Sequence, residues 1–339
     1  MAQPLHAGIP VTVERFAVVG SGSAGRRYLR LMSELRPDAH LVLVTSGMGG
    51  QKDLPKEATT VVSSIQEAVR LGLTAAVVAS PAPQHVEQAL VLVSAACPTL
   101  IEKPVATDSS DCEALVRAAT RSGSFVGVAY TLRFDLAAQQ FRSQIIDSSV
   151  GTILQARIEC GSYLPDWRSG VDYRTSVSAR ADLGGGVLLE LSHEIDYCRW
   201  FFGEIDHVQG FLTNTGNLAV EVEEAAHVLL RTTSGLTVAL IIDFHRRVPR
   251  REVVVQATTG EYHWNALMNT VTRTSGDRPP VKRSFSQTRD DMFRRQIVDF
   301  LDKSKLGLSP VVDLVDASIT LRVVEAVRLS DLSGSRVYV

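Results

Sequence analysis

The sequence predicts an α/β protein in which an N-terminal doubly wound parallel sheet is followed by an α+β domain with a large, mostly antiparallel open sheet. Two patterns support this prediction. Up to about residue 130, short apolar runs alternate with helical segments, as in a parallel sheet that helices cover on both faces. After that point, longer strand-like runs are joined by short turns and interrupted by a single helical segment, which is typical of an antiparallel sheet with segregated helices.

The strands of the first half are expected to be buried, because each is a short apolar run that ends at a glycine, a proline or a polar turn. They are predicted at residues 15–20, 40–45, 75–79, 99–101 and 125–129. Helices are predicted at 25–36 and 84–96, and a further helix begins at the cap Asp108-Ser109-Ser110-Asp111.

The second half is expected to contain strands at 153–161, 225–231, 236–244 and 252–258. One helix is predicted at 186–202, and two amphipathic helices at 289–303 and 313–329. A chain of 339 residues is long enough for two cores. We therefore expect a loose N-terminal arm (1–14), a parallel-sheet domain (15–130) and an α+β domain (131–339).

The composition indicates a globular protein. Hydrophobic residues make up 45% and charged residues 21%, and a net charge of −2 favours neither nucleic acid nor an anionic membrane as a partner. No apolar run approaches the roughly 18 residues of a membrane span, and residues 1–14 lack the pattern of a signal peptide. The four cysteines share no Cys-x-x-Cys spacing, so we expect free buried thiols in a reducing, cytoplasmic setting.

A glycine-rich loop follows the first predicted strand. The segment Gly20-Ser21-Gly22-Ser23-Ala24-Gly25 has the G-x-G-x-x-G spacing, which lets the backbone approach a pyrophosphate at a helix end. Its place between a strand and a helix predicts a dinucleotide cofactor, NAD(P)(H). Thr45 and Ser46 stand where an NAD site usually offers a carboxylate to the ribose, and Lys52 is close enough in sequence to neutralise a 2′-phosphate. The choice between NAD and NADP stays open.

The tripeptide Glu102-Lys103-Pro104 follows the predicted strand at 99–101. Ligands of a parallel sheet bind at the carboxyl ends of its strands, and the fixed φ of Pro104 restrains the chain beside Lys103. Lys103 is therefore predicted to direct its amine into the cleft as a proton-transfer group. A solvated lysine at a strand end is the common alternative, and only the neighbouring motifs argue against it.

A third motif combines Gly184-Gly185-Gly186 with Glu190, His193 and Asp196. Residues three apart on a helix are neighbours, so the imidazole of His193 is expected beside a carboxylate that fixes its tautomer and raises its basicity. The rest of this segment is apolar, which makes a polar trio unusual for a core helix. Zinc binding is a second interpretation, but no further His or Cys cluster completes a site, and no metal is predicted.

In this order, the motifs resemble those of the glucose–fructose oxidoreductase, inositol dehydrogenase and MocA family (Gfo/Idh/MocA). The resemblance covers nearly the whole chain and includes Ser80-Pro81 with His85, Arg133-Phe134 and the closing patterns at 293–301 and 316–330. It implies a Rossmann domain and a C-terminal domain whose open sheet face commonly forms oligomers. It also implies hydride transfer between nicotinamide and a carbinol carbon of a sugar or cyclitol.

The resemblance implies roles for individual residues. Lys103 and His193 correspond to the catalytic lysine and histidine. Glu190 is the candidate third member, although the family carboxylate usually lies four residues before the histidine, where this chain has Leu189. The expected cofactor contacts are Gly20, Ser21, Gly22, Ser23, Ala24, Gly25, Thr45, Ser46, Ser80, Pro81, His85, Glu102 and Lys103. The expected substrate contacts are Lys103, Arg133, Tyr163, Trp167, Arg168, Tyr173, Arg174 and His193.

Two polar segments bear on the substrate. Residues 163–174 combine aromatic rings with arginines and are expected to form a pocket wall for a polyhydroxylated or anionic sugar. They resemble the family branch associated with surface-polysaccharide sugars, and a mobile surface loop is the alternative. The basic cluster His245-Arg246-Arg247 with Arg250-Arg251 is typical of a solvated strand end, and a phosphate-bearing substrate is the alternative.

We therefore expect an NAD(P)-dependent oxidoreductase acting on a sugar, sugar derivative or cyclitol, with Lys103 and His193 handling the hydroxyl proton. Two alternatives stay open: a non-catalytic dinucleotide-binding regulator of the same fold, and a reductase of a non-sugar substrate such as an imine. A homo-oligomer, a dimer or tetramer, is expected through the C-terminal sheet.

Overall fold

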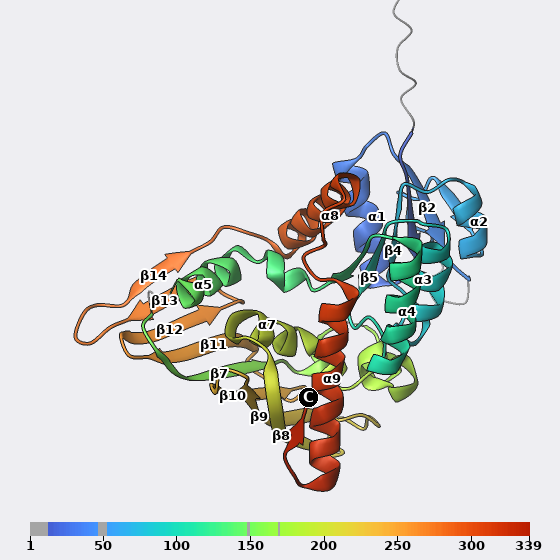
Figure 1. Ribbon diagram of the computed structural model, residues 1–339. Coiled ribbons are helices and arrows are strands. Elements are labelled where there is room, and N and C mark those ends of the chain that lie inside the picture. The colour runs from blue at the N-terminus through green and yellow to red at the C-terminus, as the bar shows by residue number, and fades with distance from the viewer. Residues whose placement is uncertain (1–12, 47–52, 148–149, 169) are drawn as a thin grey trace, which may run out of the picture.

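The structure, a computed structural model, describes residues 13–46, 53–147, 150–168 and 170–339. Most of the expected N-terminal arm, most of the loop after residue 46 and Lys52 lie outside the described residues. Two sheets form the centres of the molecule (Figure 1). Helices cover both faces of the first sheet and one face of the second.

The first sheet has six parallel strands in the order β3-β2-β1-β4-β5-β6. Its strands are β1 (Arg15–Val19), β2 (His40–Val44), β3 (Thr60–Val62), β4 (Ala75–Val78), β5 (Thr99–Glu102) and β6 (Val126–Ala129). The helices between them are α1 (Ser23–Leu35), α2 (Ile65–Arg70), α3 (His85–Ser94) and α4 (Ser109–Ser122), with the 3-10 turn η1 (Ala82–Gln84) before α3. The predicted doubly wound parallel sheet is confirmed.

Successive residues along a strand of this sheet face opposite sides and pack against different helices. In β1, Phe16 and Val18 belong to a core with α1 and α8 (Arg289–Leu306). Ala17 and Val19 belong to the larger core that includes α3 and α4. Strands of a parallel sheet need apolar cover on both faces. Since α8 comes from the end of the chain, the second half of the sequence completes the core of the first (Figure 1).

The second sheet has nine strands in the order β14-β13-β12-β11-β7-β10-β9-β8-β15. The strands are β7 (Ile153–Gly161), β8 (Ile205–Thr213), β9 (Ala225–Thr232), β10 (Thr237–Asp243), β11 (Arg250–Ala257), β12 (Gly260–Asn265), β13 (Thr270–Thr274), β14 (Val281–Ser284) and β15 (Val337–Tyr338). Strands β7 and β10 pair in parallel, and the other neighbours pair antiparallel. The predicted α+β half with a mostly antiparallel sheet is confirmed.

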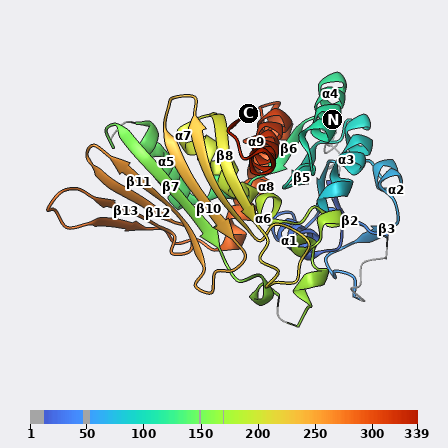
Figure 2. The same ribbon diagram turned by 90° about the horizontal axis from the view of Figure 1, so that it is seen from below.

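One face of this second sheet carries helices and the other is open. The helices α5 (Leu136–Ile146), α7 (Ser192–Phe202) and α9 (Leu314–Ser333) contact β12, β7 and β8, respectively. In β9, Val228 and Leu230 are buried on the helix side, whereas His227 and Leu229 are exposed on the other side. Figure 2 looks onto the open face, with the helices behind the strands.

The predicted single helix at 186–202 is wrong in one respect. The segment forms two helices, α6 (Val187–Glu190) and α7, with an interruption at Leu191, whose φ of −100° and ψ of 30° are not helical. The amide of Glu194 bonds to the carbonyl of Leu191 and not to that of Glu190. The Glu190 carbonyl is therefore left for another donor.

Some elements have no predicted counterpart, among them α5, β8 and the hairpin of β13 and β14. Every residue of β14 is exposed, so no apolar periodicity marks it, and its pairing with β13 makes it a strand. No helix in the described ranges offers an apolar stretch long enough to cross a membrane.

Candidate active site

The predicted cofactor and catalytic motifs meet at the carboxyl ends of β1, β4 and β5, where a doubly wound sheet forms its ligand crevice. The glycine triplet of the second half reaches the same edge. A β-carbon on Gly184 would lie 3.0 Å from the side chain of Thr107 and 3.3 Å from that of Ala82. The two halves of the chain therefore meet at this edge of the sheet.

The glycine loop has the shape that close approach of a phosphate requires. Gly20 has φ +102°, and a β-carbon there would lie 2.8 Å from the carbonyl oxygen of Ala79. A β-carbon on Gly25 would lie 1.9 Å from the Gly20 carbonyl oxygen, so α1 passes this close to the loop only with glycine. A β-carbon on Gly22 would meet nothing within 4 Å. The space beside Gly22 is therefore open to a ligand.

The start of α1 adds hydrogen-bond donors to this loop. Gly22 is the N-cap of α1, and within the described part of the chain no side chain caps the helix. The first amides of α1 thus keep N–H groups at the positive end of the helix dipole. These features fit the pyrophosphate of a dinucleotide.

Ser21 and Thr45 lie close together where the adenosine ribose is expected, with their hydroxyl oxygens 3.4 Å apart. Arg26, which sequence reasoning did not single out, donates from Nε to the Ser21 carbonyl at 3.1 Å and from Nη2 to the Asp53 carbonyl. Arg26 therefore links the glycine loop to the segment that follows β2. Its signal in the sequence is a basic residue directly after the third glycine.

Glu102 links the strand end to α1 and to Lys103. The Tyr28 hydroxyl donates to Glu102 Oε1 at 2.9 Å, and the Lys103 amide donates to Oε2 at 3.1 Å. Burial raises the pKa of the Glu102 carboxyl. The peptide bond between Lys103 and Pro104 is cis.

His85 ties together two loops at this edge of the sheet. Its Nδ1 lies 2.9 Å from the Pro104 carbonyl oxygen, and its Nε2 lies 2.7 Å from the Ser80 carbonyl oxygen. The ring is buried, and burial lowers the pKa of His85. Both ring nitrogens face main-chain oxygens, so His85 shapes the loops that carry Ser80-Pro81 and Lys103. Direct contacts of His85, Ser80 and Pro81 with a cofactor stay predictions.

Lys103 reaches Glu190 across the crevice. Its Nζ donates to the Glu190 main-chain oxygen at 2.7 Å and lies 3.8 Å from the carboxylate Oε1. The carbonyl is available because the helix is interrupted at Leu191. Leu189, at the usual place of the family carboxylate, is buried in the apolar core. The structure thus brings Glu190 to Lys103.

His193 lies in the first turn of α7 and is half-buried. Its ring packs edge-on against Tyr130 with centroids 5.5 Å apart, and among the described residues its Nδ1 has no hydrogen-bond partner. Burial lowers the pKa of His193 well below its usual value. The positive charges of Lys103, Arg251 and Arg289 lower it further. The expected carboxylate beside the ring, raising its basicity, is therefore wrong.

Asp196 is the partner of Arg133 in the interior and not of His193. Arg133 donates to the two Asp196 carboxylate oxygens at 2.7 and 3.1 Å, and its Nη2 also lies 2.8 Å from Asp316 Oδ2. The side chains of Arg133 and Asp196 are 7% and 1% exposed. The guanidinium that was expected to contact the substrate is instead held inside the protein by two carboxylates.

The glycine triplet has a packing role. A β-carbon on Gly185 would lie 2.4 Å from the Val177 carbonyl oxygen. Gly186 has φ +105°, and its β-carbon would lie 2.5 Å from the Glu223 carboxylate. These close approaches pack the start of α6 against the Val177 loop and Glu223, both in the second half of the chain.

The aromatic residues of the segment 163–174 are already packed. The Arg247 guanidinium lies 3.4 Å from the centre of the Tyr163 ring. Trp167 packs edge-on against Phe244 at 5.4 Å, and its indole N–H is buried with no partner among the described residues. The Tyr173 hydroxyl donates to the Leu218 carbonyl at 2.8 Å.

The charged residues of this segment are exposed. Arg174 binds Asp172 of its own loop through hydrogen bonds of 2.8, 2.9 and 3.2 Å. Arg168 is exposed as well. Contacts of Arg168, Arg174 and the aromatic residues with a substrate stay predictions.

The structure divides the basic cluster at 245–251. Arg246 and Arg250 both bind Glu159, at 2.8 and 3.3 Å. Arg251 points to the helix side of the sheet, where its Nε donates to Glu194 Oε1 at 2.8 Å. Glu194 directly follows His193 in α7, and the positive charge of Arg251 is among the causes that lower the pKa of His193. The alternation of 251 with the buried residues 253 and 255 is the sequence signal that separates it from its neighbours.

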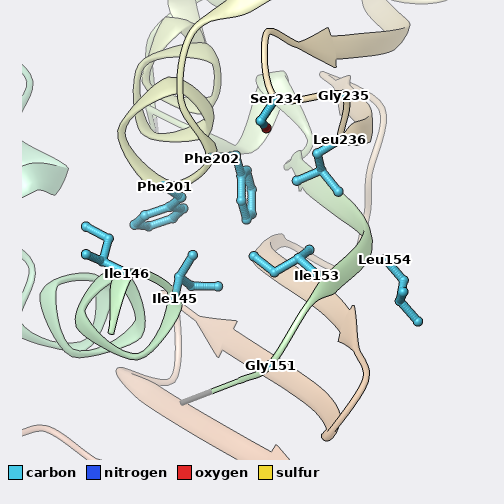
Figure 3. Close-up of a pocket in the computed structure, with 10 residues that line it drawn as sticks. All are labelled: Ile145, Ile146, Gly151, Ile153, Leu154, Phe201, Phe202, Ser234, Gly235 and Leu236. Atoms are coloured by element: carbon cyan, nitrogen blue, oxygen red, sulfur yellow. The ribbon is translucent and has the colours of Figure 1, made fainter. Parts of the chain in front are cut away.

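A pocket of about 400 Å³ lies at the other end of α7 (Figure 3). It is lined mainly by apolar side chains, including Ile145, Phe201 and Phe202. Phe201 follows His193 by eight residues, roughly 12 Å along the helix axis. This pocket is separate from the candidate site. In the described ranges, no group of three or more His, Cys, Asp and Glu side chains is placed to hold a metal ion.

Two family models match the chain, one over the half that contains the first sheet and the other over the half that contains the second sheet. Residues 14–130 match the family model described as an oxidoreductase family with an NAD-binding Rossmann fold. Residues 138–263 match the model described as the GFO/IDH/MocA C-terminal domain.

Individual relatives agree with these matches. The myo-inositol dehydrogenase Hyg17 of Streptomyces leeuwenhoekii is 32% identical over 190 residues. The match covers 55% of this chain and 55% of Hyg17, so this chain spans about half the length of that relative. A levoglucosan dehydrogenase in complex with NADH and levoglucosan has a TM-score of 0.86 at 16% identity, over 97% of this chain and 100% of its own. The aldose–aldose oxidoreductase of Caulobacter crescentus, complexed with glycerol, has a TM-score of 0.81 at 20% identity, over 97% and 100%. These two structures share the fold.

Proposed function

The chain belongs to the GFO/IDH/MocA oxidoreductase family, and on that basis we propose that it is an NAD(P)-dependent dehydrogenase or reductase. Its substrate would be a sugar, sugar derivative or cyclitol that reacts at a CH–OH or keto carbon. The observation that carries the proposal is the approach of Lys103 to Glu190 across the crevice, at 2.7 Å from Nζ to the main-chain oxygen. This contact joins Lys103 of the first half to Glu190 of the second, three residues before His193.

A bound nicotinamide would accept the hydride in oxidation and donate it in reduction. In oxidation the substrate hydroxyl must also lose its proton. His193 is suited to accept this proton because burial and nearby cations keep its imidazole neutral before substrate binds. The ammonium of Lys103, held by Glu190, would donate a hydrogen bond to the same oxygen as negative charge develops on it.

Steady-state turnover of NAD and NADP with inositols, aldoses and anhydro-sugars tests the proposal. We expect Lys103→Ala and His193→Ala each to lower kcat by about a hundredfold or more while dinucleotide affinity is retained. Lys282→Ala, on the exposed strand β14, is the matched control. Full activity in both site variants would exclude the assignment. If the wild-type protein binds dinucleotide but converts no sugar, the result would favour the alternative of a non-catalytic dinucleotide-binding regulator.

We further propose that a homo-oligomer forms through the open face of the second sheet. The strand register places Leu229, Ala239, Arg157 and Val254 in one row across four strands of this face. Leu229 is 53% exposed, and Phe211 on the neighbouring strand is 62% exposed. Large exposed apolar side chains on a flat sheet favour association with a second copy.

Sedimentation analysis of Leu229→Glu tests this interface. A charge in the middle of the row should dissociate the oligomer, whereas Leu332→Glu, at an 83% exposed position in α9, should not. An unchanged mass for Leu229→Glu would place the interface elsewhere.

For localisation we propose the cytoplasm. All four cysteines are free and buried, as is usual in a reducing compartment. Fractionation of cells that express the tagged full chain would test this, and recovery in a secreted or periplasmic fraction would contradict it.

A further inference from the structure

We propose that Tyr130 is a positioning residue for the reaction, and that its aromatic ring orients the His193 imidazole in place of the expected carboxylate. The inference rests on the proposed function and adds a residue to it. It follows from the contacts of the His193 ring, and from the way the segment that begins at Tyr130 packs against the helix α7.

The carboxylates closest to His193 in the sequence all have other partners. Each of the three within three residues of His193 is paired with a basic side chain of another segment: Glu190 with Lys103, Glu194 with Arg251 and Asp196 with Arg133. In the described part of the chain, the buried Nδ1 of His193 has no hydrogen-bond partner. A hydrogen bond at the second ring nitrogen often orients a functional histidine. Here the orientation of the ring must come from packing.

The ring of Tyr130 provides that packing. It meets the imidazole of His193 in a T-shaped, edge-to-face arrangement, with centroids 5.5 Å apart and planes at 82°. Within the described ranges this is the only ring contact of His193. Aromatic rings prefer an edge-to-face arrangement to a stacked one, so this contact restrains the tilt of the imidazole.

Tyr130 is itself held at its main chain and by burial. Its side chain is fully buried at the end of β6. Its amide donates to the Val128 carbonyl at 2.9 Å, and its carbonyl accepts from the Arg133 amide at 3.0 Å. The hydroxyl is buried and has no hydrogen-bond partner among the described residues. The ring, and not the hydroxyl, is therefore the part of Tyr130 that acts on His193.

The segment that begins at Tyr130 contacts α7 at a second point. Arg133, in the 3-10 turn η2 (Thr131–Phe134), donates to both carboxylate oxygens of Asp196. Residues three apart on a helix are neighbours on one face, so Asp196 lies about one turn from His193. A ring contact at one turn and an ion pair at the next hold the start of α7 against the end of β6.

An aromatic partner suits the proposed role of His193. A carboxylate beside the ring would stabilise the imidazolium, whereas the Tyr130 ring restrains the imidazole without adding a formal charge. Burial lowers the pKa of His193 in this setting. The imidazole is therefore both oriented and neutral, as a group that accepts the substrate proton must be.

Steady-state kinetics of Tyr130 variants, with the panel of inositols, aldoses and anhydro-sugars, tests the proposal. Tyr130→Phe keeps the ring, so kcat should stay within about twofold of the wild-type value. Tyr130→Leu removes the ring and should lower kcat by about tenfold or more with NADH affinity retained, because a displaced catalytic group loses its alignment with the substrate. Tyr130→Met takes the place of Tyr130→Leu if that variant does not fold.

Phe141→Leu is the matched control for the loss of a buried ring. Phe141 is also fully buried, and it packs edge-on against Phe201 at the other end of α7, with centroids 5.2 Å apart. A cavity there should lower Tm but leave kcat near the wild-type value. An equal loss of kcat in Phe141→Leu and Tyr130→Leu would mean that any cavity beside α7 impairs the enzyme, and it would overturn the proposal.

A double variant separates positioning of His193 from a general structural effect. If Tyr130 acts through His193, adding Tyr130→Leu to His193→Ala should lower kcat no further. The same fold loss in both backgrounds would overturn the proposal. So would wild-type kcat in Tyr130→Leu, or a loss in Tyr130→Phe as large as that in Tyr130→Leu, which would assign the role to the hydroxyl.

Failure of this proposal can be told apart from failure of the proposed function. Full activity of His193→Ala would reject the proton-transfer role of His193, and the positioning role of Tyr130 with it. If His193→Ala is impaired and Tyr130→Leu is not, only the positioning role is rejected and the proposed function stands.

Discussion

The ammonium of Lys103 lies between two oxygens of Glu190, 2.7 Å from the main-chain carbonyl and 3.8 Å from the carboxylate. The shorter contact goes to a group that any residue at position 190 would provide. It exists because the helix is interrupted at Leu191 and leaves this carbonyl without a helical donor. The lysine is thus held chiefly by the backbone, and the carboxylate adds a second, longer contact.

This geometry predicts that replacing Glu190 and replacing Lys103 lower kcat by different amounts. Glu190→Gln should lower kcat by about tenfold or less, because the carbonyl still holds the lysine, whereas Lys103→Ala should lower it by about a hundredfold or more. Steady-state kinetics would measure both, with Glu113→Gln on the exposed face of α4 as the control. If Glu190→Gln is as impaired as Lys103→Ala, the carboxylate itself is essential.

The lowered pKa of His193 predicts the acid limb of the pH profile. His193 accepts a proton only when it is neutral, so kcat/KM for oxidation should fall as pH drops through its pKa. Since burial and nearby cations move this pKa below the usual value of 6.5, the limb should lie below pH 6.5, with a plateau at neutral pH. The profile of His193→Gln should lack this limb. A limb above pH 6.5 that persists in the variant would assign it to another group.

Replacing Arg289 should shift the acid limb of the pH profile of kcat/KM to higher pH. Loss of a nearby positive charge stabilises the imidazolium, so the pKa of His193 should rise and the acid limb should shift to higher pH in Arg289→Gln. The pH dependence of kcat/KM measures this shift, with Arg121→Gln as the control. No shift would mean that solvent screens Arg289 from His193 in the working enzyme.

Two glycines of the same loop should differ when changed to alanine. A β-carbon on Gly25 would overlap the Gly20 carbonyl at 1.9 Å, so Gly25→Ala should destabilise the first domain and lower Tm. A β-carbon on Gly22 meets nothing within 4 Å, so Gly22→Ala should keep the wild-type Tm. It should still weaken NADH binding by about tenfold or more, because it fills the space of the pyrophosphate. Normal NADH binding by Gly22→Ala would show that the dinucleotide lies elsewhere.

The buried pair of Arg133 and Asp196 should matter for stability. Asp196→Ala leaves a buried guanidinium with only Asp316, and we expect the free energy of unfolding in urea to fall by about 3–5 kcal/mol. Asp182→Ala, which removes an exposed pair with Arg180, is the control and should cause no measurable change. Wild-type stability of Asp196→Ala would mean that Asp316 alone compensates Arg133.

Sequence patterns succeeded where neighbours along the chain decide the outcome. The apolar strands of the first sheet, the tight turn at Gly20–Gly25 and the position of Lys103 at a strand end all follow from local periodicity and backbone freedom. The same reasoning failed at Leu191, where the helix is interrupted and the Glu190 carbonyl accepts a hydrogen bond from Lys103, a residue far away in the sequence. It failed at β14 because pairing with β13, and not apolar burial, makes that strand.

Local sequence was thus sufficient for the class of fold and for the turn at Gly20–Gly25, whereas the catalytic roles of Lys103 and His193 stay predictions. Contacts between distant segments settled the rest: that Glu190 meets Lys103, that Asp196 binds Arg133, and that Arg251 binds Glu194, the residue after His193. The reason is physical. Strand and helix periodicities act over a few residues, whereas the partner of a charged side chain depends on which segments the two sheets and α8 bring together.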